Sequence, residues 1–147
     1  MTQEDKELLL KDLCSRLPYG VKIELTWWVM GEGTYINTTL EPDHIEQLLN
    51  DEDGDTESKP YLRPMSNMTE EEFTNLKEYS GLKYDQLDLA SFQNGTYKCL
   101  DFYLSEVPSA VVIKVFDWLN RYHFDYRNLI QIGLAIAVTK ENNPYKE

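Results

Sequence analysis

The densest group of side chains that could perform chemistry lies between residues 117 and 137. His123 stands there among aromatic residues and close to Asp125, and an imidazole oriented by a carboxylate can act as a general base. The same corner could instead bind a ligand. The structural alternative is a turn between two helices, in which His123 binds a backbone carbonyl and Arg127 pairs with an acid. The sequence favours the structural role, because it offers no second histidine or suitably spaced nucleophile beside His123.

A second pattern could hold a metal ion. Pro42-Asp43, followed by Glu57-Ser58-Lys59, matches the bare letters of a PD-(D/E)xK nuclease site. In such a site carboxylates hold a divalent metal and the lysine activates water, at the ends of adjacent strands. Here the lysine precedes Pro60, and a proline argues against a central strand. A metal-dependent hydrolase that uses Asp43 is therefore kept only as a second alternative.

The remaining catalytic signatures fail. Asp51, Asp53 and Asp55 alternate like the first ligands of a calcium-binding EF-hand loop, but Thr56 replaces the glycine and Leu62 the final glutamate. The chain also has no glycine-rich phosphate loop, no Gly-x-Ser-x-Gly elbow and no Cys-x-x-Cys pair. We therefore expect no metal, no cofactor and no enzymatic activity.

The net charge of −12 is concentrated in the middle of the chain, where residues 41–107 hold 16 acidic and 5 basic side chains. Such acidity repels phosphate backbones, so direct nucleic-acid binding is not expected. The simplest interpretation is a solvated acidic face that promotes solubility. The alternative is that the acidic middle imitates a polyanion or docks on a basic partner.

The elements that must position these residues follow from hydrophobic spacing and from helix and turn signals. Thr2 with Asp5, and Thr69 with Glu72, are typical of capped helix starts. Asn94-Gly95 between two β-prone runs favours a hairpin turn. The expected elements are a helix at 3–17, strands at 21–29 and 34–40, a short helix near 43–49 capped by Asp43, a helix at 70–79, strands at 87–92 and 97–104, a helix from Pro108 to 119, a short helix at 126–132 that Gly133 ends, and a last strand or buried tail at 134–138.

These elements predict the α+β class: a single domain, 1–147, with antiparallel hairpins packed against several short helices. Its acidic loop near 51–58 is expected to be mobile. The two cysteines are too few for a disulfide framework, and Cys14, on the apolar side of the first helix, is expected to be a small core residue. The polar N-terminus is unlike a signal peptide, and no apolar run approaches the roughly 20 residues of a membrane span. The expected location is cytoplasmic, without membrane association.

Three blocks of the sequence, 11–21, 59–72 and 117–137, together resemble a group of uncharacterised small proteins of gut bacteria, of the phage or prophage type. The blocks cover roughly a third of the chain. The group has no assigned activity, cofactor or catalytic residue, so the resemblance implies a context and no chemistry. That context is an intracellular accessory protein of a mobile element.

The function that follows is binding to a protein partner. Tyrosine and arginine are favoured at binding hot spots, so the tyrosine-rich corner is the expected contact surface. The candidate residues are Tyr61, Arg63, Trp118, Tyr122, His123, Asp125, Tyr126 and Arg127. The first alternative is an acidic inhibitor that occupies the nucleic-acid-binding site of a host protein. The sequence does not identify the partner, the oligomeric state or the pairing order of the strands.

Overall fold

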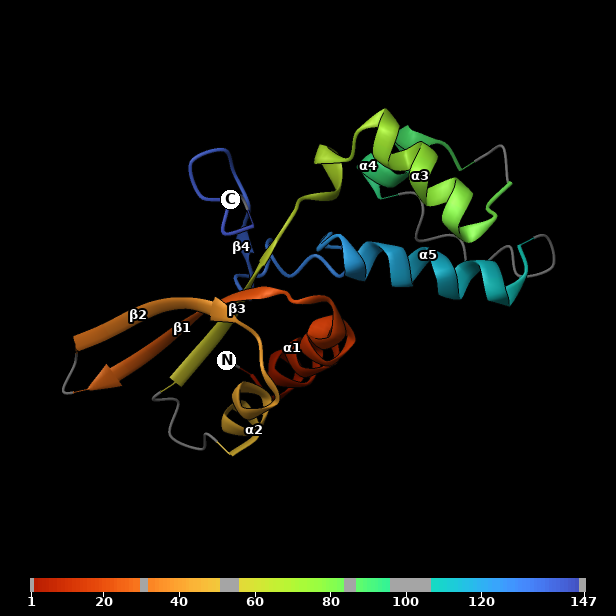
Figure 1. The fold of residues 1–147 in the computed structure, drawn as a ribbon. Coiled ribbons are helices and arrows are strands. Elements are labelled where there is room, and N and C mark those ends of the chain that lie inside the picture. Colours follow the sequence, from red (N-terminus) through yellow and green to blue (C-terminus); the bar gives the residue numbers. More distant parts are fainter. Residues whose placement is uncertain (1, 30–31, 51–55, 84–86, 96–106, 146–147) are drawn as a thin grey trace. The chain divides into compact units, whose positions relative to one another are not determined.

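The structure is a computed structural model that describes residues 2–29, 32–50, 56–83, 87–95 and 107–145. The chain forms two compact units (Figure 1). Unit 1 consists of residues 1–62 and 127–147, and unit 2 of residues 63–126. Unit 2 is thus inserted in the sequence of unit 1. The α+β class is confirmed.

Unit 1 contains a four-stranded sheet in the order β2-β1-β3-β4. Its elements are α1 (Gln3–Arg16), a 3₁₀ turn (Leu17–Tyr19), β1 (Lys22–Val29), β2 (Glu32–Thr39), α2 (Pro42–Asn50), β3 (Thr56–Leu62) and β4 (Ile136–Ala137). The predicted hairpin of β1 and β2 is confirmed, and β3 pairs antiparallel with the other side of β1. Because β4 runs parallel to β3, the sheet is mixed and not purely antiparallel.

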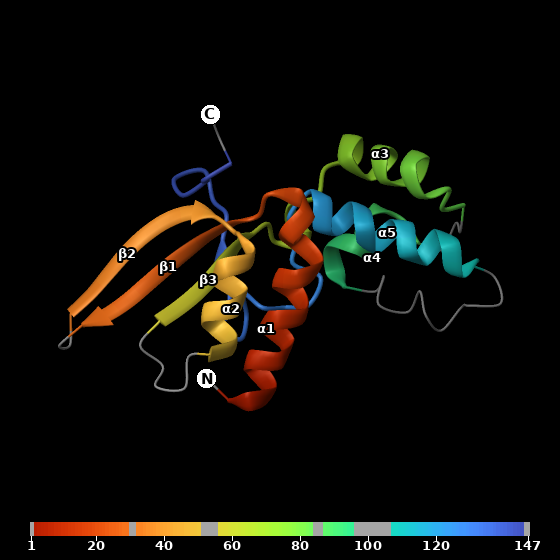
Figure 2. The same cartoon turned by 60° about the horizontal axis from the view of Figure 1, so that its bottom comes forward.

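The helices of unit 1 cover one face of this sheet, and Figure 2 shows α1 and α2 side by side in front of it. The capping box of Thr2 and Asp5 starts α1, and Gly20 ends the following turn with a left-handed φ of 67°. Alternate residues of β1 point toward the helices, as the period of a strand requires. The core contains Leu9, Leu13, Val21, Ile23, Leu40, Leu48, Leu62, Leu129, Leu134 and Ala135.

The expectation that no central strand contains Pro60 is wrong. Residues 56–58, expected in a mobile loop, also belong to β3, which pairs on both sides. Backbone groups in an antiparallel ladder face the neighbouring strand at every second residue. Leu40 N–H donates to Val21 C=O at 2.9 Å, so the odd residues of β1 face β2 and its even residues face β3. Pro60, opposite Ile23, therefore turns its nitrogen away from β1, and the ladder with β4 begins one residue later.

Unit 2 is helical in its described part. It contains a 3₁₀ turn (Met65–Asn67), α3 (Glu70–Ser80), α4 (Leu89–Asn94) and α5 (Ser109–Arg121). The capping box of Thr69 and Glu72 and the stop at Gly81 are confirmed, while Pro108 is the N-cap residue of α5 and stands just before its first turn. The core contains Met65, Met68, Phe73, Leu76, Leu82, Leu87, Phe92, Val107, Val112, Val115, Trp118, Leu119 and Phe124.

The predicted hairpin at Asn94-Gly95 is wrong, because residues 89–94 form α4. The Asp88 side chain accepts a hydrogen bond from the Ser91 N–H, which starts the helix, and Gly95 ends it with a φ of 89°. Asparagine followed by glycine is equally suited to a helix C-terminus, where glycine adopts the left-handed conformation. The second predicted strand, 97–104, lies outside the described residues.

Three smaller predictions are also corrected. Residues 126–132 form turns and no helix, although Gly133 still closes them, with Leu134 N–H donating to Leu129 C=O. Asp43 lies inside the first turn of α2 and is not its N-cap. Cys14 is exposed and does not belong to the core. The predicted tail at 134–138 contains β4. None of the helices in the described ranges has the length and hydrophobicity that crossing a membrane requires.

Candidate functional site

The structure divides the predicted contact surface between the units. Tyr61 and Arg127 belong to unit 1, and the other six residues to unit 2. Burial then removes three of them as contacts, because Tyr61, Trp118 and Asp125 expose only 2%, 1% and 6% of their surface. Tyr122 is exposed, whereas Arg63, His123, Tyr126 and Arg127 are half-buried. Five of the eight predicted residues therefore keep enough exposed surface to contact a partner.

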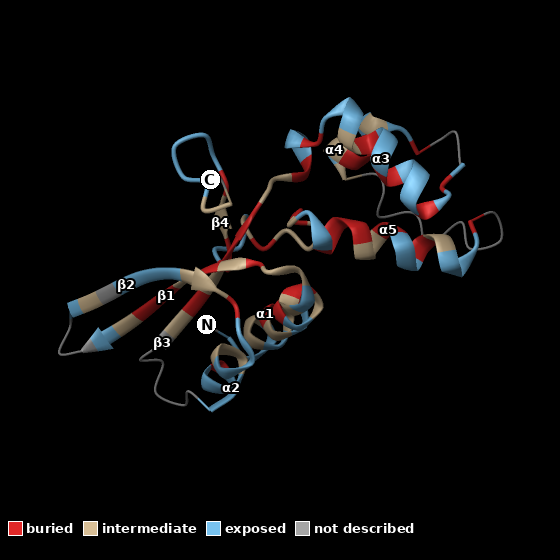
Figure 3. Cartoon of the chain, in the orientation of Figure 1, coloured by how far each residue is buried: buried red, intermediate tan, exposed pale blue. Residues whose placement is uncertain are grey.

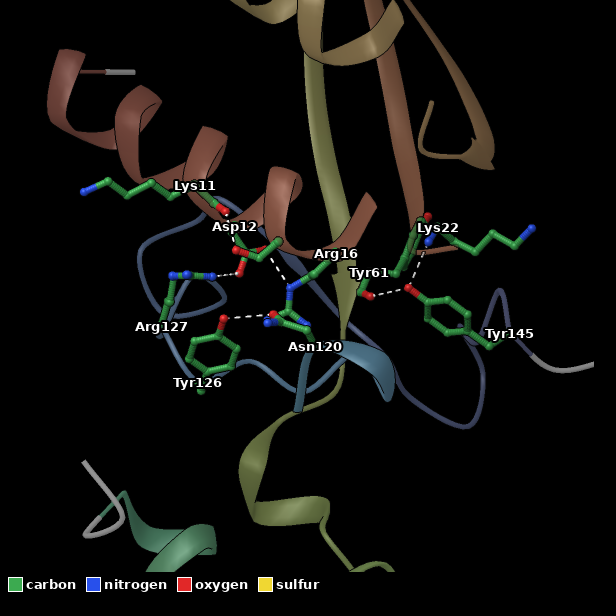
Figure 4. Close-up of polar contacts among 10 residues, drawn as sticks. Lys11, Asp12, Arg16, Lys22, Tyr61, Asn120, Tyr126, Arg127 and Tyr145 are labelled. Atoms are coloured by element: carbon green, nitrogen blue, oxygen red, sulfur yellow. Dashed lines mark hydrogen bonds and ion pairs between the residues drawn. The ribbon is translucent and has the colours of Figure 1, made fainter. Parts of the chain in front are cut away.

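Arg127 has a structural role in unit 1 (Figure 4). Its Nη1 lies 2.9 Å from Oδ1 of Asp12, whose Oδ2 lies 2.9 Å from Nε of Arg16. Asp12 and Arg16 are one helical turn apart on α1, and both side chains are fully buried. The expectation that Arg127 pairs with an acid is confirmed. One carboxylate thus links two arginines and ties the segment after unit 2 to α1.

Tyr145 makes a second link in unit 1 (Figure 4). Its hydroxyl donates to the backbone carbonyl of Tyr61 at 2.7 Å and accepts from the backbone N–H of Lys22 at 2.9 Å. Burial raises the pKa of Tyr145 well above its ordinary value, so this hydroxyl stays protonated. The side chain therefore satisfies backbone groups of both β3 and β1.

The Tyr61 hydroxyl belongs to a polar cluster on the sheet. It donates to Oδ1 of Asn37 at 2.9 Å and lies 3.3 Å from Oε2 of Glu24. Burial, together with the negative charge of Glu24, raises the pKa of Tyr61. Each of these three residues stands on a different strand, so the cluster joins β1, β2 and β3.

In unit 2, Arg63 organises the corner that contains His123. Its backbone N–H donates to the His123 carbonyl at 2.7 Å, its carbonyl accepts from the Asp125 N–H at 2.9 Å, and its guanidinium lies 4.2 Å from the ring centre of Phe124. His123 adopts a left-handed φ of 65°, which fits a tight corner. These contacts give the corner a structural explanation and favour that role over a general base.

The Arg63 side chain also binds the start of α3. Its Nη1 and Nη2 lie 2.6 and 2.9 Å from the two carboxylate oxygens of Glu72. Burial raises the pKa of Glu72, but the hydrogen bonds from Arg63 and Thr69 outweigh it and hold this pKa below its ordinary value. Farther along, Tyr126 donates its hydroxyl to Oδ1 of Asn120 at 2.8 Å. Arg63 and Tyr126 are thus committed to contacts inside unit 2.

A different group of side chains lies on α3, on α5 and at the C-cap of α5, and we call it the α3–α5 surface; all of its members are exposed except Asp117, which is half-buried. It consists of Tyr79, Ile113, Asp117, Arg121 and Tyr122. Figure 3 shows exposed segments on both helices. Ile113 exposes 69% of its surface, Tyr79 37% and Tyr122 39%. The spacing of Ile113, Asp117 and Arg121 by four residues puts them on one face of α5, away from the buried Val112, Val115 and Leu119.

Contacts within the α3–α5 surface hold its polar groups in place. The Tyr79 hydroxyl donates to Oδ2 of Asp117, and Nη2 of Arg121 lies 3.9 Å from the same oxygen. The Arg121 guanidinium also lies 5.2 Å from the ring centre of Tyr79. The rings of Tyr122 and the buried Trp118 are 4.6 Å apart. Of these five residues, the sequence analysis had selected only Tyr122. The four-residue spacing on α5 was the available signal for Ile113, Asp117 and Arg121.

Glu57, Ser58 and Lys59 of the nuclease-like pattern line a pocket of unit 1, which measures about 250 Å³. Its lining residues are Asp5, Leu9, Glu57, Ser58, Lys59, Ile132, Gly133 and Leu134. Asp43 is not among them. Within the ranges that the structure describes, no three acidic, histidine or cysteine side chains could hold a metal ion together. The hydrolase alternative therefore gains no metal site from the described residues.

The acidic middle of the chain is described in part. Glu41, Asp43 and Glu46 are exposed around the start of α2. The acidic residues from 51 to 55 lie outside the described residues. The inhibitor alternative, which requires one ordered acidic face, therefore stays a prediction.

The comparisons with known proteins add no relative. No family model, curated protein or solved structure matches this chain.

Proposed function

We propose that the protein acts by binding another protein, and that the α3–α5 surface is its contact site. The observation that supports this is the shared contact of Tyr79 and Arg121 with Asp117, next to the exposed Ile113. Tyrosine and arginine are enriched at binding hot spots. The setting, an accessory role in a phage or other mobile element, rests on the sequence resemblance alone.

The geometry also favours affinity, because it lowers the entropy that binding would cost. Long side chains such as arginine lose rotamer freedom when a partner immobilises them. Here the Arg121 guanidinium is already held between the Tyr79 ring and the Asp117 carboxylate. A partner with an apolar patch would cover Ile113 and Tyr79, and a carbonyl or carboxylate group would accept hydrogen bonds from Arg121.

The test uses a photoreactive amino acid at position 113, with a second variant that carries it at position 49. Leu49 is a matched control, because it is an exposed aliphatic residue of a helix in unit 1. In nuclease-treated bacterial lysate, position 113 should crosslink to one protein that position 49 does not capture. The additional changes Tyr79→Ser and Arg121→Ser should abolish that crosslink. Equal capture from both positions, or capture unaffected by the two changes, would contradict the proposal.

Salt separates this proposal from the acidic inhibitor. A contact anchored by Ile113 and Tyr79 should survive high salt, because burial of apolar surface is not screened. A contact between the acidic middle and a basic partner should weaken steeply as salt rises. Loss of the crosslink only at high salt would therefore favour the inhibitor.

A further inference from the structure

The outer edge of β2 in unit 1 has no partner strand among the described residues. β2 stands at the end of the sheet order, and only β1 pairs with it. The ladder runs residue for residue over eight pairs, from Lys22 opposite Thr39 to Val29 opposite Glu32, so no bulge interrupts it. A regular strand of this length presents a row of unpaired N–H and C=O groups on its open side.

The hydrogen bond from Leu40 to Val21 identifies these groups. It belongs to a directly opposed pair, and such pairs alternate between bonded and unbonded along an antiparallel ladder. The even residues of β2 therefore bond to β1. Its odd residues, Gly33, Tyr35, Asn37 and Thr39, direct their N–H and C=O groups outward.

Among the described residues, this edge lacks the usual protection against strand pairing. Proteins block an open edge with lysine, proline, a bulge or a covering element. β2 contains no lysine and no proline, and its only charged residue is Glu32 at its start. Near its middle, Tyr35 exposes 57% and Ile36 41% of their surface. Figure 3 shows little burial along β2, in contrast to β1.

We infer that a second copy of the chain occupies this edge, with the two β2 strands antiparallel about a two-fold axis at Ile36. In this register Tyr35 stands opposite Asn37 of the second copy, and Gly33 opposite Thr39. All four outward residues of each strand then exchange hydrogen bonds with the other strand. The two sheets become one continuous sheet of eight strands.

Side chains at the seam match this register. Ile36 stands opposite the buried Leu25 and therefore on the face that the helices of unit 1 cover. Directly opposed side chains of an antiparallel pair have Cβ atoms about 5 Å apart. The Ile36 side chain would therefore pack against Ile36 of the second copy at the axis. The apolar contact would then continue from one sheet into the other and explain an exposed isoleucine at the centre of an edge strand.

On the face of the sheet opposite to Ile36, the surrounding aromatic rings explain why residue 33 is a glycine. A Cβ atom there would come within 3.0 Å of the Tyr35 hydroxyl, because the rings of Tyr35 and Trp28 lie over this glycine. These two rings make an edge-on contact with centres 6.3 Å apart. The aromatic cover compensates for the side chain that glycine lacks and keeps the strand regular up to its start.

Charge permits the pairing in spite of the net −12. Glu32 and its copy would lie eight residues apart along the seam, which is about 27 Å at 3.4 Å per residue. This exceeds the screening length of about 8 Å at physiological salt. The remaining negative charges repel at long range, so added salt should strengthen the dimer. A seam of two strands is small compared with stable interfaces, so the dimer should be weak and reversible.

The first test is sedimentation of the full chain over a wide concentration range, with amide exchange followed by NMR. The expected result is a reversible dimer, with added protection at Tyr35 and Asn37 as concentration rises. The amide of Ile36, which bonds to β1, should be protected at every concentration. A monomer throughout, or protection that does not alternate along β2, would overturn the inference.

The second test places charge at the axis. Ile36→Lys and Ile36→Glu should each be monomeric, because like charges would meet across the seam, whereas an equimolar mixture should form a heterodimer. Leu49→Lys is the matched control, as an exposed apolar residue of the same unit away from the edge, and it should dimerise like the parent. Dimers of either single variant, or a mixture that stays monomeric, would contradict the register.

Discussion

Removal of the Asp12 carboxylate should destabilise unit 1 far more than removal of any exposed acid. The side chains of Asp12 and Arg16 are fully buried, and Arg127 approaches the same carboxylate from a segment more than 100 residues away. The change Asp12→Ala leaves the Arg16 guanidinium buried without this negative charge. Breaking one side of a buried ion pair costs about 3–5 kcal/mol, because the remaining charge stays desolvated.

The contribution of Arg127 to this loss is smaller. Its side chain keeps 23% of its surface exposed, so water replaces part of the lost contact. The loss of stability caused by Asp12→Ala is still large compared with the free energy of unfolding of a domain, which is roughly 5–15 kcal/mol. For a chain of 147 residues, each kcal/mol lowers the melting temperature by about 3 °C. We therefore expect a decrease of about 10 °C.

The assay is thermal unfolding for the melting temperature and urea unfolding for the free energy, both at pH 7 and followed by circular dichroism, with Glu7→Ala as the matched control. Glu7 is an exposed acid on the same helix, and its removal changes the net charge equally. The double change Asp12→Leu with Arg16→Met should recover stability, because it removes both charges of the α1 pair. A loss for Asp12→Ala no larger than for Glu7→Ala would refute the reasoning.

Three further predictions concern single side chains. Glu72→Gln should cost about 1–2 kcal/mol at pH 7. Because the folded-state pKa lies below the unfolded one, this stabilisation is complete at neutral pH and is lost as pH falls through the folded pKa. Parent and variant should therefore converge in urea titrations at acid pH. Tyr145→Phe should cost about 1–3 kcal/mol in the same titration, because it leaves two backbone groups of the sheet without a partner. Cys14→Ser should remove one thiol that reacts with a thiol reagent in the folded protein; unchanged reactivity would contradict the exposure of Cys14.

The sequence predicted the elements whose signals are local. The two capping boxes and the alternation along β1 need only neighbouring residues, and all are confirmed. The hairpin predicted at Asn94-Gly95 is wrong because this pair suits both a hairpin turn and a helix end. The hydrogen bond from the Ser91 N–H to Asp88 favours the helix. The prediction that excluded Pro60 from a central strand is wrong because a proline is tolerated where its nitrogen points away from the neighbouring strand. That direction follows only from the pairing register of β3 with β1.

The candidate site was less predictable, because exposure depends on contacts between distant segments. Tyr61 and Trp118 have the side chains of a hot spot, yet both are buried, Tyr61 in a cluster with two other strands and Trp118 with its Nε1 donating to Asn75. That Arg127 pairs with an acid followed from its type, but nothing local identified Asp12. The spacing of Ile113 and Arg121 along α5 was visible, but the place of Tyr79 beside them depends on how α3 packs against α5.

The insertion of unit 2 into the sequence of unit 1 has a consequence for biosynthesis. All of unit 2 has been translated once residue 126 is added, whereas unit 1 still needs Arg127 for Asp12, β4 for β3 and Tyr145 for Lys22. At 5–20 residues per second, the 19 residues from 127 to 145 take roughly one to four seconds. During this interval the Asp12–Arg16 pair lacks Arg127. The side of β3 that later pairs with β4 has no partner strand. A translational pause in this stretch would prolong the exposure of that strand to chaperones and proteases.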